Sequence, residues 1–268
     1  MSRRLSEVFA QAKSANRGAL IGYLPAGYPT AAASVELLNT MIDAGVDAIE
    51  VGLPYSDPLM DGADIQFAVA AALAGGTTTD VVLDVVGRLD GERAALLVMS
   101  YWNPIERYGV ERFAARLAAA GGNGVITPDL TPEEAGPWFA ATKANAIDTI
   151  FLVAPSSTDE RIKAVVANTS GFVYAASTMG VTGARSQVGG GAEPLVTRTR
   201  RVTGLPISVG LGVSTGAQAR EVATYADGVI VGSAFVRCIR AAADLPAAIA
   251  AVRDLAGELA EGVRRPSD

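Results

Sequence analysis

The chain of 268 residues contains no histidine. Histidine is the most frequent general acid or base in enzymes, the base in Ser-His-Asp and Cys-His systems, and a ligand in most catalytic zinc sites. Its absence excludes those mechanisms, and no metal site is expected. Any chemistry must therefore use carboxylates, hydroxyls and backbone groups.

Lysine and cysteine are nearly as scarce. Lys13, Lys143 and Lys163 are the only lysines, and all fall in segments predicted to be helical, where none is placed to form a Schiff base. The single cysteine, Cys238, cannot form an internal disulfide. It lies in a run predicted to be helical, 234–239, where a packing thiol is expected rather than a nucleophile.

Positive charge is in the minority, because 22 Lys and Arg oppose 28 Asp and Glu for a net charge of −6. The chain lacks the basic stripe that binds a phosphate backbone, so no nucleic-acid partner is expected. No apolar run reaches the roughly 20 residues of a membrane-spanning helix. The start of the chain also lacks the apolar region of a signal peptide. We therefore predict a cytoplasmic protein with no membrane partner.

Short apolar runs, by contrast, are plentiful. Eight strand-like runs, separated by helical segments, lie at 19–24, 48–51, 95–101, 124–127, 149–153, 171–175, 205–209 and 228–231. Near-continuous apolar runs are typical of strands buried on both faces of a parallel sheet. Eight such units in about 250 residues predict a (β/α)8 TIM barrel. An open doubly wound sheet is the alternative.

Two segments lie outside this repeat. Residues 5–14 predict an extra N-terminal helix that plugs the N-terminal end of the barrel, and residues 244–262 predict a long closing helix. Thr30 and Thr215 are placed to cap two of the helices inside the repeat. No linker or change of composition divides the chain, so a single domain covering residues 1–268 is expected.

Two carboxylates stand out. Glu50 lies near the end of the run at 48–51, where strand alternation places it on the same face as Ala48 and Gly52. An acid there is either a structural carboxylate held by backbone N–H groups or a catalytic group. Asp61 follows in a loop rich in Pro and Gly and can reach the same strand end. The pair favours acid/base chemistry.

Glycine-rich loops follow the last three predicted strands, at 180–183, 210–212 and 232–233. Backbone N–H groups at such loops, with Ser233 opening a helix, form the usual phosphate site of TIM barrels. A single Gly-x-Gly would indicate only a turn, but three consecutive loops favour a phosphorylated substrate. Other polar residues at strand ends, such as Tyr101 and Tyr174, could equally be core or turn residues.

These motifs resemble those of the tryptophan synthase alpha subunit family. The similarity runs from about residue 5 to residue 262 and is carried by Glu50 to Gly62, Gly180 to Gly183, Gly210 to Ser214 and Val231 to Ala234. It implies cleavage of indole-3-glycerol phosphate to indole and glyceraldehyde 3-phosphate. It also implies an alpha2beta2 heterotetramer, in which the beta subunit carries pyridoxal phosphate and this chain needs no cofactor of its own.

The resemblance implies a role for individual positions. Glu50 and Asp61 match the catalytic acids. Substrate-binding positions match Tyr23, Met99, Tyr101, Ile126, Leu152, Tyr174, Thr182 and Leu211, and phosphate-binding positions match Gly183, Gly212, Gly232 and Ser233. Some members of the family have phenylalanine in place of Tyr23, which should alter packing only. Others have arginine in place of Thr178, which leaves the anchoring of the loop 180–191 open.

The chemistry of the residues agrees with this reaction. A retro-aldol cleavage usually needs a lysine imine or a metal as electron sink, and neither is predicted here. Indole protonated at C3 supplies the sink itself. Glu50 would donate that proton and take one from the glycerol hydroxyl, while Asp61 would accept a hydrogen bond from the ring N–H.

Three alternatives remain. A sugar-phosphate isomerase would also use a glutamate and a phosphate site, but would normally need a histidine or lysine electrophile. A non-catalytic barrel subunit that activates a partner would not need both acids. A stand-alone indole-3-glycerol-phosphate lyase would have an identical site.

A partner surface is expected beside the catalytic acids. The loop from Pro54 to Asp61 brings apolar and proline residues to the rim, where they are costly to leave in water. The expected interface residues are Pro54, Tyr55, Asp57, Pro58, Asn103 and Asp129. A beta subunit covering them would fix Asp61 in place and couple binding to catalysis.

Overall fold

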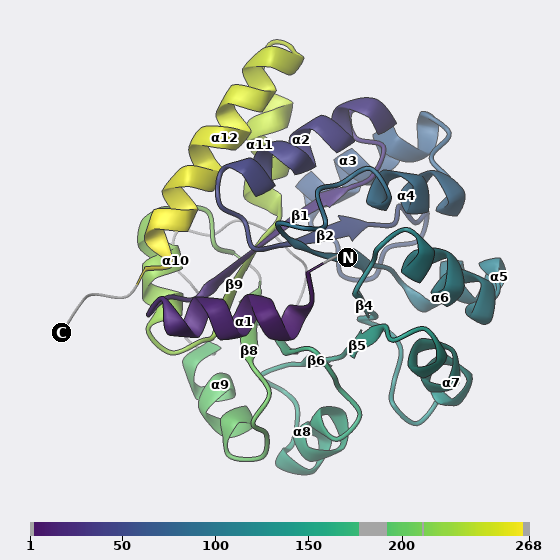
Figure 1. Ribbon diagram of the computed structural model, residues 1–268, viewed down its shortest axis with the longest axis vertical. Coiled ribbons are helices and arrows are strands. Elements are labelled where there is room, and N and C mark those ends of the chain that lie inside the picture. The colour runs from purple at the N-terminus through teal and green to yellow at the C-terminus, as the bar shows by residue number, and fades with distance from the viewer. Residues whose placement is uncertain (1–2, 177–191, 211, 265–268) are drawn as a thin grey trace.

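The computed structural model describes residues 3–176, 192–210 and 212–264. It is a TIM barrel, as predicted (Figure 1). The strands of the described ranges are β1 (Ala19–Pro25), β2 (Ala48–Gly52), β3 (Ala95–Met99), β4 (Gly124–Ile126), β5 (Asp148–Ile150), β6 (Leu152–Val153), β7 (Val173–Ala176), β8 (Ile207–Gly210) and β9 (Gly228–Val231).

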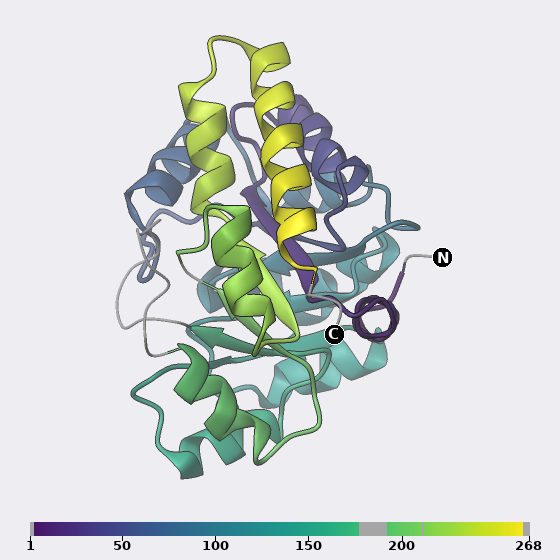
Figure 2. The ribbon, with the colours of Figure 1, turned by 90° about the vertical axis from the view of Figure 1, so that its left-hand side faces the viewer.

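Helices surround these strands. Within the same ranges they are α1 (Leu5–Ser14), α2 (Ala31–Asp43), α3 (Ala63–Ala74), α4 (Thr79–Val86), α5 (Trp102–Tyr108), α6 (Val110–Ala119), α7 (Gly136–Ala144), α8 (Asp159–Val166), α9 (Ala192–Arg200), α10 (Gly216–Ala223), α11 (Ser233–Ala241) and α12 (Leu245–Gly262). Thr30 and Thr215 accept the N-cap hydrogen bonds of α2 and α10, as the sequence predicts. α12 lies beside α11 and α2 (Figures 1 and 2).

The sheet runs in the order β5-β4-β3-β2-β1-β9-β8-β7-β6, and all neighbours are parallel. Eight strands were expected, whereas nine are present in the described part of the chain. The difference lies at Phe151, which interrupts the fifth expected strand. The first half, β5, pairs with β4, and the second half, β6, pairs with β7. One split strand therefore joins both ends of the order and nearly closes the barrel.

Apolar side chains pack in two layers. The larger layer lies between the strands and the surrounding helices, and Ile49 and Val51 of β2 belong to it. The smaller layer fills the N-terminal part of the barrel interior, where Ala48 of β2 meets Leu5 and Phe9 of α1. The N-terminal helix thus plugs that end of the barrel, as expected. Glu50 follows Ala48 on the inward-facing side of β2.

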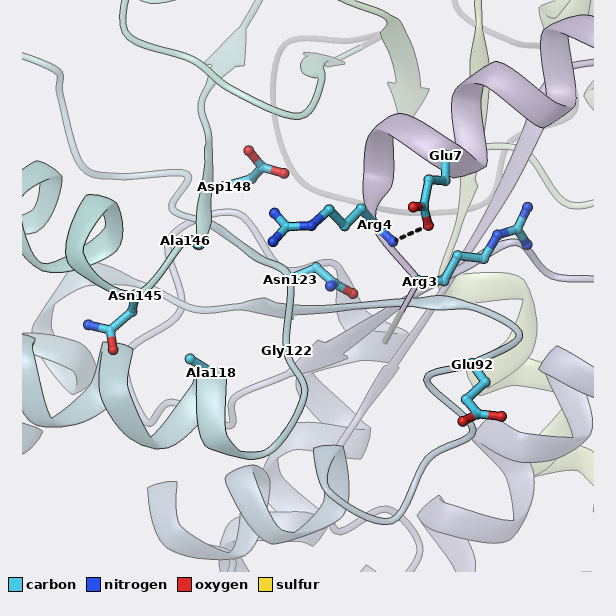
Figure 3. A pocket seen from close by; sticks show the side chains of 10 residues that line it. All are labelled: Arg3, Arg4, Glu7, Glu92, Ala118, Gly122, Asn123, Asn145, Ala146 and Asp148. Atoms are coloured by element: carbon cyan, nitrogen blue, oxygen red, sulfur yellow. Dashed lines mark hydrogen bonds between the residues drawn. The ribbon is translucent and has the colours of Figure 1, made fainter. Parts of the chain in front are cut away.

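The plugged end also has a hollow of about 480 Å³ beside α1, between the starts of β4 and β5 (Figure 3). Arg4 extends from the start of α1 towards Asp148, and its backbone N–H donates to Glu7 at 3.1 Å. The hollow is lined by Arg3, Arg4, Glu7, Glu92, Ala118, Gly122, Asn123, Asn145, Ala146 and Asp148. It lies at the opposite end from the loop that carries Asp61.

No single helix in the described ranges is long and apolar enough to cross a membrane. α3 and α4 reach that length only as a pair, and they meet at a bend of 106°.

Candidate active site

Glu50 lies in the middle of β2 and is 1% exposed. Its neighbour in the pairing register of β1 is Tyr23, and its neighbour in β3 is Leu97. Strand alternation turns Glu50 into the barrel, because Ile49 and Val51 occupy the outer layer. The isolated acid seen in the sequence is therefore a fully buried carboxyl inside the barrel.

The carboxyl group of Glu50 is poorly satisfied. Its Oε1 atom has no hydrogen-bond partner among the described residues. Burial raises the pKa of Glu50 to about 8, because water no longer solvates the carboxylate. Glu50 is therefore protonated at neutral pH before substrate binds, and the structural alternative, a carboxylate held by several backbone N–H groups, does not describe it.

Asp61 lies at the end of the loop after β2, just before α3, and is 9% exposed. The Tyr101 hydroxyl donates to its Oδ1 at 3.1 Å, and its backbone oxygen accepts from Gln66 Nε2 at 2.7 Å. Burial raises the pKa of Asp61, while the hydrogen bond from Tyr101 lowers it. Asp61 is thus held by a donor that favours its ionised form, unlike Glu50.

Two further tyrosines line the same space. Tyr23 and Tyr174 are buried, and burial raises the pKa of both hydroxyls. The charges of Asp61 and Glu50 raise the pKa of Tyr23 further, and the charge of Glu50 raises the pKa of Tyr174 further. Each hydroxyl lies against a glycine where a Cβ atom would clash, Tyr23 against Gly52 and Tyr174 against Gly210. Gly210 therefore makes room for a tyrosine, a role that the glycine pattern alone does not reveal.

The remaining expected substrate-binding residues have mixed burial. Ile126 is fully buried, while Met99 and Leu152 are partly exposed and pack against the inner core layer. Thr182 and Leu211 lie outside the described residues. The described part of this set gives an apolar wall on strands β3, β4 and β6, beside the acids.

Part of the expected phosphate site is visible. Gly212 has φ +101°, a left-handed conformation that favours glycine. Gly232 is the N-cap of α11 and Ser233 is its first residue. The N–H of Phe235 donates to the Gly232 carbonyl at 2.9 Å, whereas the N–H of Ser233, at the first position of the helix, has no preceding turn to donate to. A Cβ atom at Gly232 would lie 3.0 Å from Cδ1 of Tyr23. Gly183 and the rest of its loop lie outside the described residues.

Of the loop residues expected at the partner surface, only some are exposed. Pro54 is buried, and the half-buried Tyr55 ring packs against Tyr101 with centroids 5.6 Å apart. Asp57 is exposed and accepts from Ser56 Oγ at 2.6 Å, and Pro58 is half-buried. The exposed apolar residue of this loop is Leu59, 70% exposed, which sequence reasoning missed. The available signal was a leucine directly after Pro58, in a loop that ends at Asp61.

The other two expected interface residues behave differently from each other. Asn103 is exposed and lines a hollow of about 460 Å³ together with Pro54 and Asp57. Asp129 is also exposed, but both of its carboxylate oxygens accept from the backbone N–H of Trp102, at 2.9 and 3.1 Å. Asp129 therefore anchors the start of α5 as well as facing the rim.

Comparisons with known proteins agree on one family. The family model described as "Tryptophan synthase alpha chain" matches residues 9–264. The tryptophan synthase alpha chain of Thermobifida fusca is 59% identical over 263 residues, which cover 97% of each chain. That of Mycobacteroides abscessus is 56% identical over 262 residues, or 98% of each chain.

Solved structures give the same result. A structure of Mycobacterium tuberculosis tryptophan synthase matches with a TM-score of 0.92 and 53% identity, covering 99% of this chain and 100% of that one. The alpha subunit from Legionella pneumophila str. Paris matches with a TM-score of 0.89 at 29% identity, covering 98% of each chain. The family model, the curated relatives and the solved structures therefore agree that the chain belongs to the tryptophan synthase alpha chain family.

Proposed function

We propose that Glu50 and Asp61 are the catalytic acids of the family's reaction, the cleavage of indole-3-glycerol phosphate to indole and glyceraldehyde 3-phosphate, a lyase reaction. The observation that supports this most strongly is the state of Glu50. A buried carboxyl with a pKa raised to about 8 holds a proton at neutral pH that it can give to carbon.

Over the whole cleavage Glu50 donates one proton and takes one back, so it ends in the protonation state in which it began. Glu50 protonates C3 of the indole ring, which becomes an iminium. The bond between C3 and the glycerol side chain then breaks, and its electron pair restores the aromatic ring. The glycerol hydroxyl loses its proton to the Glu50 carboxylate and becomes the aldehyde of glyceraldehyde 3-phosphate. The reaction consumes no external acid or base.

Asp61 complements Glu50 because the hydrogen bond from Tyr101 favours its ionised form. We propose that its carboxylate accepts a hydrogen bond from the indole N–H and stabilises the positive charge that develops there. In a site shielded from water, such a preorganised charge stabilises the transition state more than it would in solution. The tyrosines Tyr23 and Tyr174, with Met99, Ile126 and Leu152, would enclose the ring.

The phosphate of the substrate is proposed to bind at Gly212, Gly232 and Ser233, together with Gly183 of the loop outside the described residues. A valine at Gly212 or Gly232 would be an ambiguous test, because Gly212 has a positive φ and Gly232 touches Tyr23. Ser233→Asp is cleaner. Aspartate is well tolerated in the first turn of a helix, but its charge would repel the phosphate and weaken substrate binding.

Thr30→Asp is the matched control for this substitution, since it places the same charge at the N-cap of α2. Calorimetric titration with glycerol phosphate should show weaker binding only for Ser233→Asp. Equal affinity in the two variants would move the phosphate to another part of the rim.

The alpha chain is the subunit of tryptophan synthase without its own cofactor, and it works with a beta subunit. We propose that the beta subunit carries pyridoxal phosphate, that the assembly is an alpha2beta2 heterotetramer in the cytoplasm, and that residues 1–268 act as one domain. The support for the contact surface is the exposed rim at Asp57, Leu59 and Asn103.

One experiment tests both the reaction and the partnership. The purified chain is mixed with indole-3-glycerol phosphate, with and without a cognate beta subunit, and indole release is followed. Cleavage by the isolated chain that accelerates with the beta subunit is the expected result. Full-speed cleavage with no response to the beta subunit would favour the stand-alone lyase. No cleavage in either mixture would favour a non-catalytic barrel subunit.

A further inference from the structure

Tyr101 occupies an unusual position for a residue expected only to contact substrate. It follows β3, serves as the N-cap of α5, and is 6% exposed. Its hydroxyl oxygen accepts from two backbone N–H groups, that of Leu59 at 3.1 Å and that of Met60 at 2.9 Å. The same oxygen lies 3.1 Å from Oδ1 of Asp61. Three consecutive residues of one loop therefore converge on one phenol.

This arrangement fixes the position of the protons. A phenol has one proton, and both backbone groups are donors, so the hydroxyl proton must point at Asp61. The Asp61 oxygen that receives it must then act as an acceptor, which an ionised carboxylate does without restriction. The network therefore requires a neutral Tyr101, and it is strongest with an ionised Asp61, because a hydrogen bond to a charged acceptor is stronger than one to a neutral acceptor. Burial raises the pKa of Tyr101 to about 12, which keeps it neutral.

The ring of Tyr101 contributes a second contact to the same loop. The Tyr55 ring packs against it at an interplanar angle of 41°. Tyr101 thus holds the loop near its start through its ring and at its end through its hydroxyl. A substitution that deletes only the hydroxyl would break the contacts at the end of the loop and keep the ring contact near its start.

We propose that Tyr101 is a positioning residue, whose hydroxyl ties residues 59–61 to the end of β3 and keeps Asp61 ionised and correctly oriented for the cleavage. This inference rests on the proposed catalytic role of Asp61. It assigns to the Tyr101 hydroxyl an effect on the chemical step, distinct from the effect of the ring as part of the indole pocket.

The surroundings of Asp61 determine the expected pH dependence. The titratable groups that interact with Asp61 are Tyr101, which follows β3, and Tyr23 of β1. Tyr23 also interacts with Glu50 of β2, which is protonated below pH about 8. Burial raises the pKa of Asp61 and the Tyr101 hydroxyl opposes that rise. Without the hydroxyl the pKa of Asp61 should increase, so the fall in activity on the acidic side should begin at higher pH.

Tyr101→Phe tests this directly, because it keeps the ring and removes only the hydroxyl. We expect kcat for indole-3-glycerol phosphate cleavage to fall by roughly 10- to 100-fold, the effect of losing a hydrogen bond to a charged group. KM should change little, and the acidic limb of the kcat/KM profile should move to higher pH, because the hydrogen bond that lowers the pKa of Asp61 is lost. A raised KM with an unchanged kcat and acidic limb would make Tyr101 a simple wall of the pocket.

Tyr108→Phe is the matched control. Its hydroxyl also donates to an aspartate, Asp80 at 2.5 Å, but on the outer helices away from the barrel interior. Its kinetics and pH profile should match those of the parent chain. An equal shift in both variants would mean that the effect is not specific to the site.

Asp61→Asn, alone and combined with Tyr101→Phe, separates this proposal from the proposed function. If Asp61→Asn alone leaves cleavage intact, Asp61 is not catalytic and both proposals fail. If it impairs cleavage, Tyr101→Phe should add little in the double variant, because the two residues act together. Fully additive losses would leave Asp61 catalytic and overturn only the positioning role of Tyr101.

Discussion

Two buried acids lie three residues apart at β2, and they have opposite surroundings. Asp47, just before the strand, is 6% exposed, and Glu50, within it, is 1% exposed. The Asp47 carboxylate accepts hydrogen bonds from both terminal guanidinium nitrogens of Arg17, at 2.5 and 2.7 Å, and from the backbone N–H of Leu20 at 2.9 Å. Glu50 has one oxygen with no partner among the described residues.

The difference distinguishes a structural acid from a reactive one. Asp47 is a buried charge whose hydrogen bonds replace the water it loses, and it ties β2 to Arg17 and to the start of β1. Glu50 lacks such compensation, so its proton is retained and remains available for chemistry. Burial alone therefore does not identify a catalytic acid. Burial of a carboxyl group without hydrogen-bond partners is the better criterion.

The largest expected effect comes from removing the proton of Glu50. Glu50→Gln keeps the shape of the side chain but cannot exchange a proton with substrate. Cleavage should fall by at least the roughly 10²- to 10⁴-fold typical of general acid/base catalysis. Steady-state indole release at neutral pH measures the loss. Turnover close to that of the parent would exclude Glu50 as the proton carrier.

Asp47→Asn should show the reverse pattern. It leaves Arg17 without its charged partner in a mostly buried pair, so the free energy of unfolding should fall by about 3 kcal/mol. Indole release by the folded fraction should stay within about twofold of the parent, since Asp47 precedes β2 at its N-terminal end and barrel active sites lie at the C-terminal ends of the strands. Urea denaturation and activity, measured on the same sample, check this. Lost activity without lost stability would contradict the assigned structural role.

The sequence predicts the role of Glu50 better than that of Asp47. An isolated acid in an apolar run, followed by a second acid in the next loop, is enough to single out Glu50 and Asp61 as candidate catalytic residues. The partner of Asp47 cannot be found this way, because Arg17 lies thirty residues earlier and meets it only through the pairing of β1 with β2. Periodicity gives the face of a strand but not the contacts between distant segments.

The same limit explains the other differences. Apolar runs predict the eight units of the barrel, but the split at Phe151 depends on how the sheet closes between β4 and β7. The hydrogen bonds of Tyr101 depend on the path of the loop at 59–61, which no local pattern determines. Pro54 was expected at the partner surface because its loop lies on the rim, yet it is buried within the chain itself.

A smaller effect concerns the dependence of stability on pH. Glu50 has a pKa of about 8 in the folded chain against an ordinary value of 4.5. As pH rises from about 4.5 to 8, the unfolded chain loses this proton before the folded chain does, so stability is lost across that window. Glu50→Gln removes the effect. Relative to the parent, the variant should gain on the order of 3 kcal/mol in unfolding free energy between pH 5 and pH 9.

Paired urea titrations of the two proteins at pH 5, 7 and 9 would measure this gain. A stability difference that stays constant over the range would show that Glu50 is already ionised in the folded chain. The proton donor in the cleavage would then have to be another group.

The smallest expected effect comes from an ion pair that is exposed. Arg93 pairs with Asp43 at the surface, where the two side chains are 53% and 63% exposed, against 19% and 7% for Arg17 and Asp47. Water solvates both partners equally well when they are apart, so Asp43→Ala should change the unfolding free energy by less than about 0.5 kcal/mol. The same urea titration as for Asp47→Asn gives the comparison. Similar losses in the two variants would mean that burial does not set the strength of pairing here, and the contrast between Asp47 and Glu50 would need another cause.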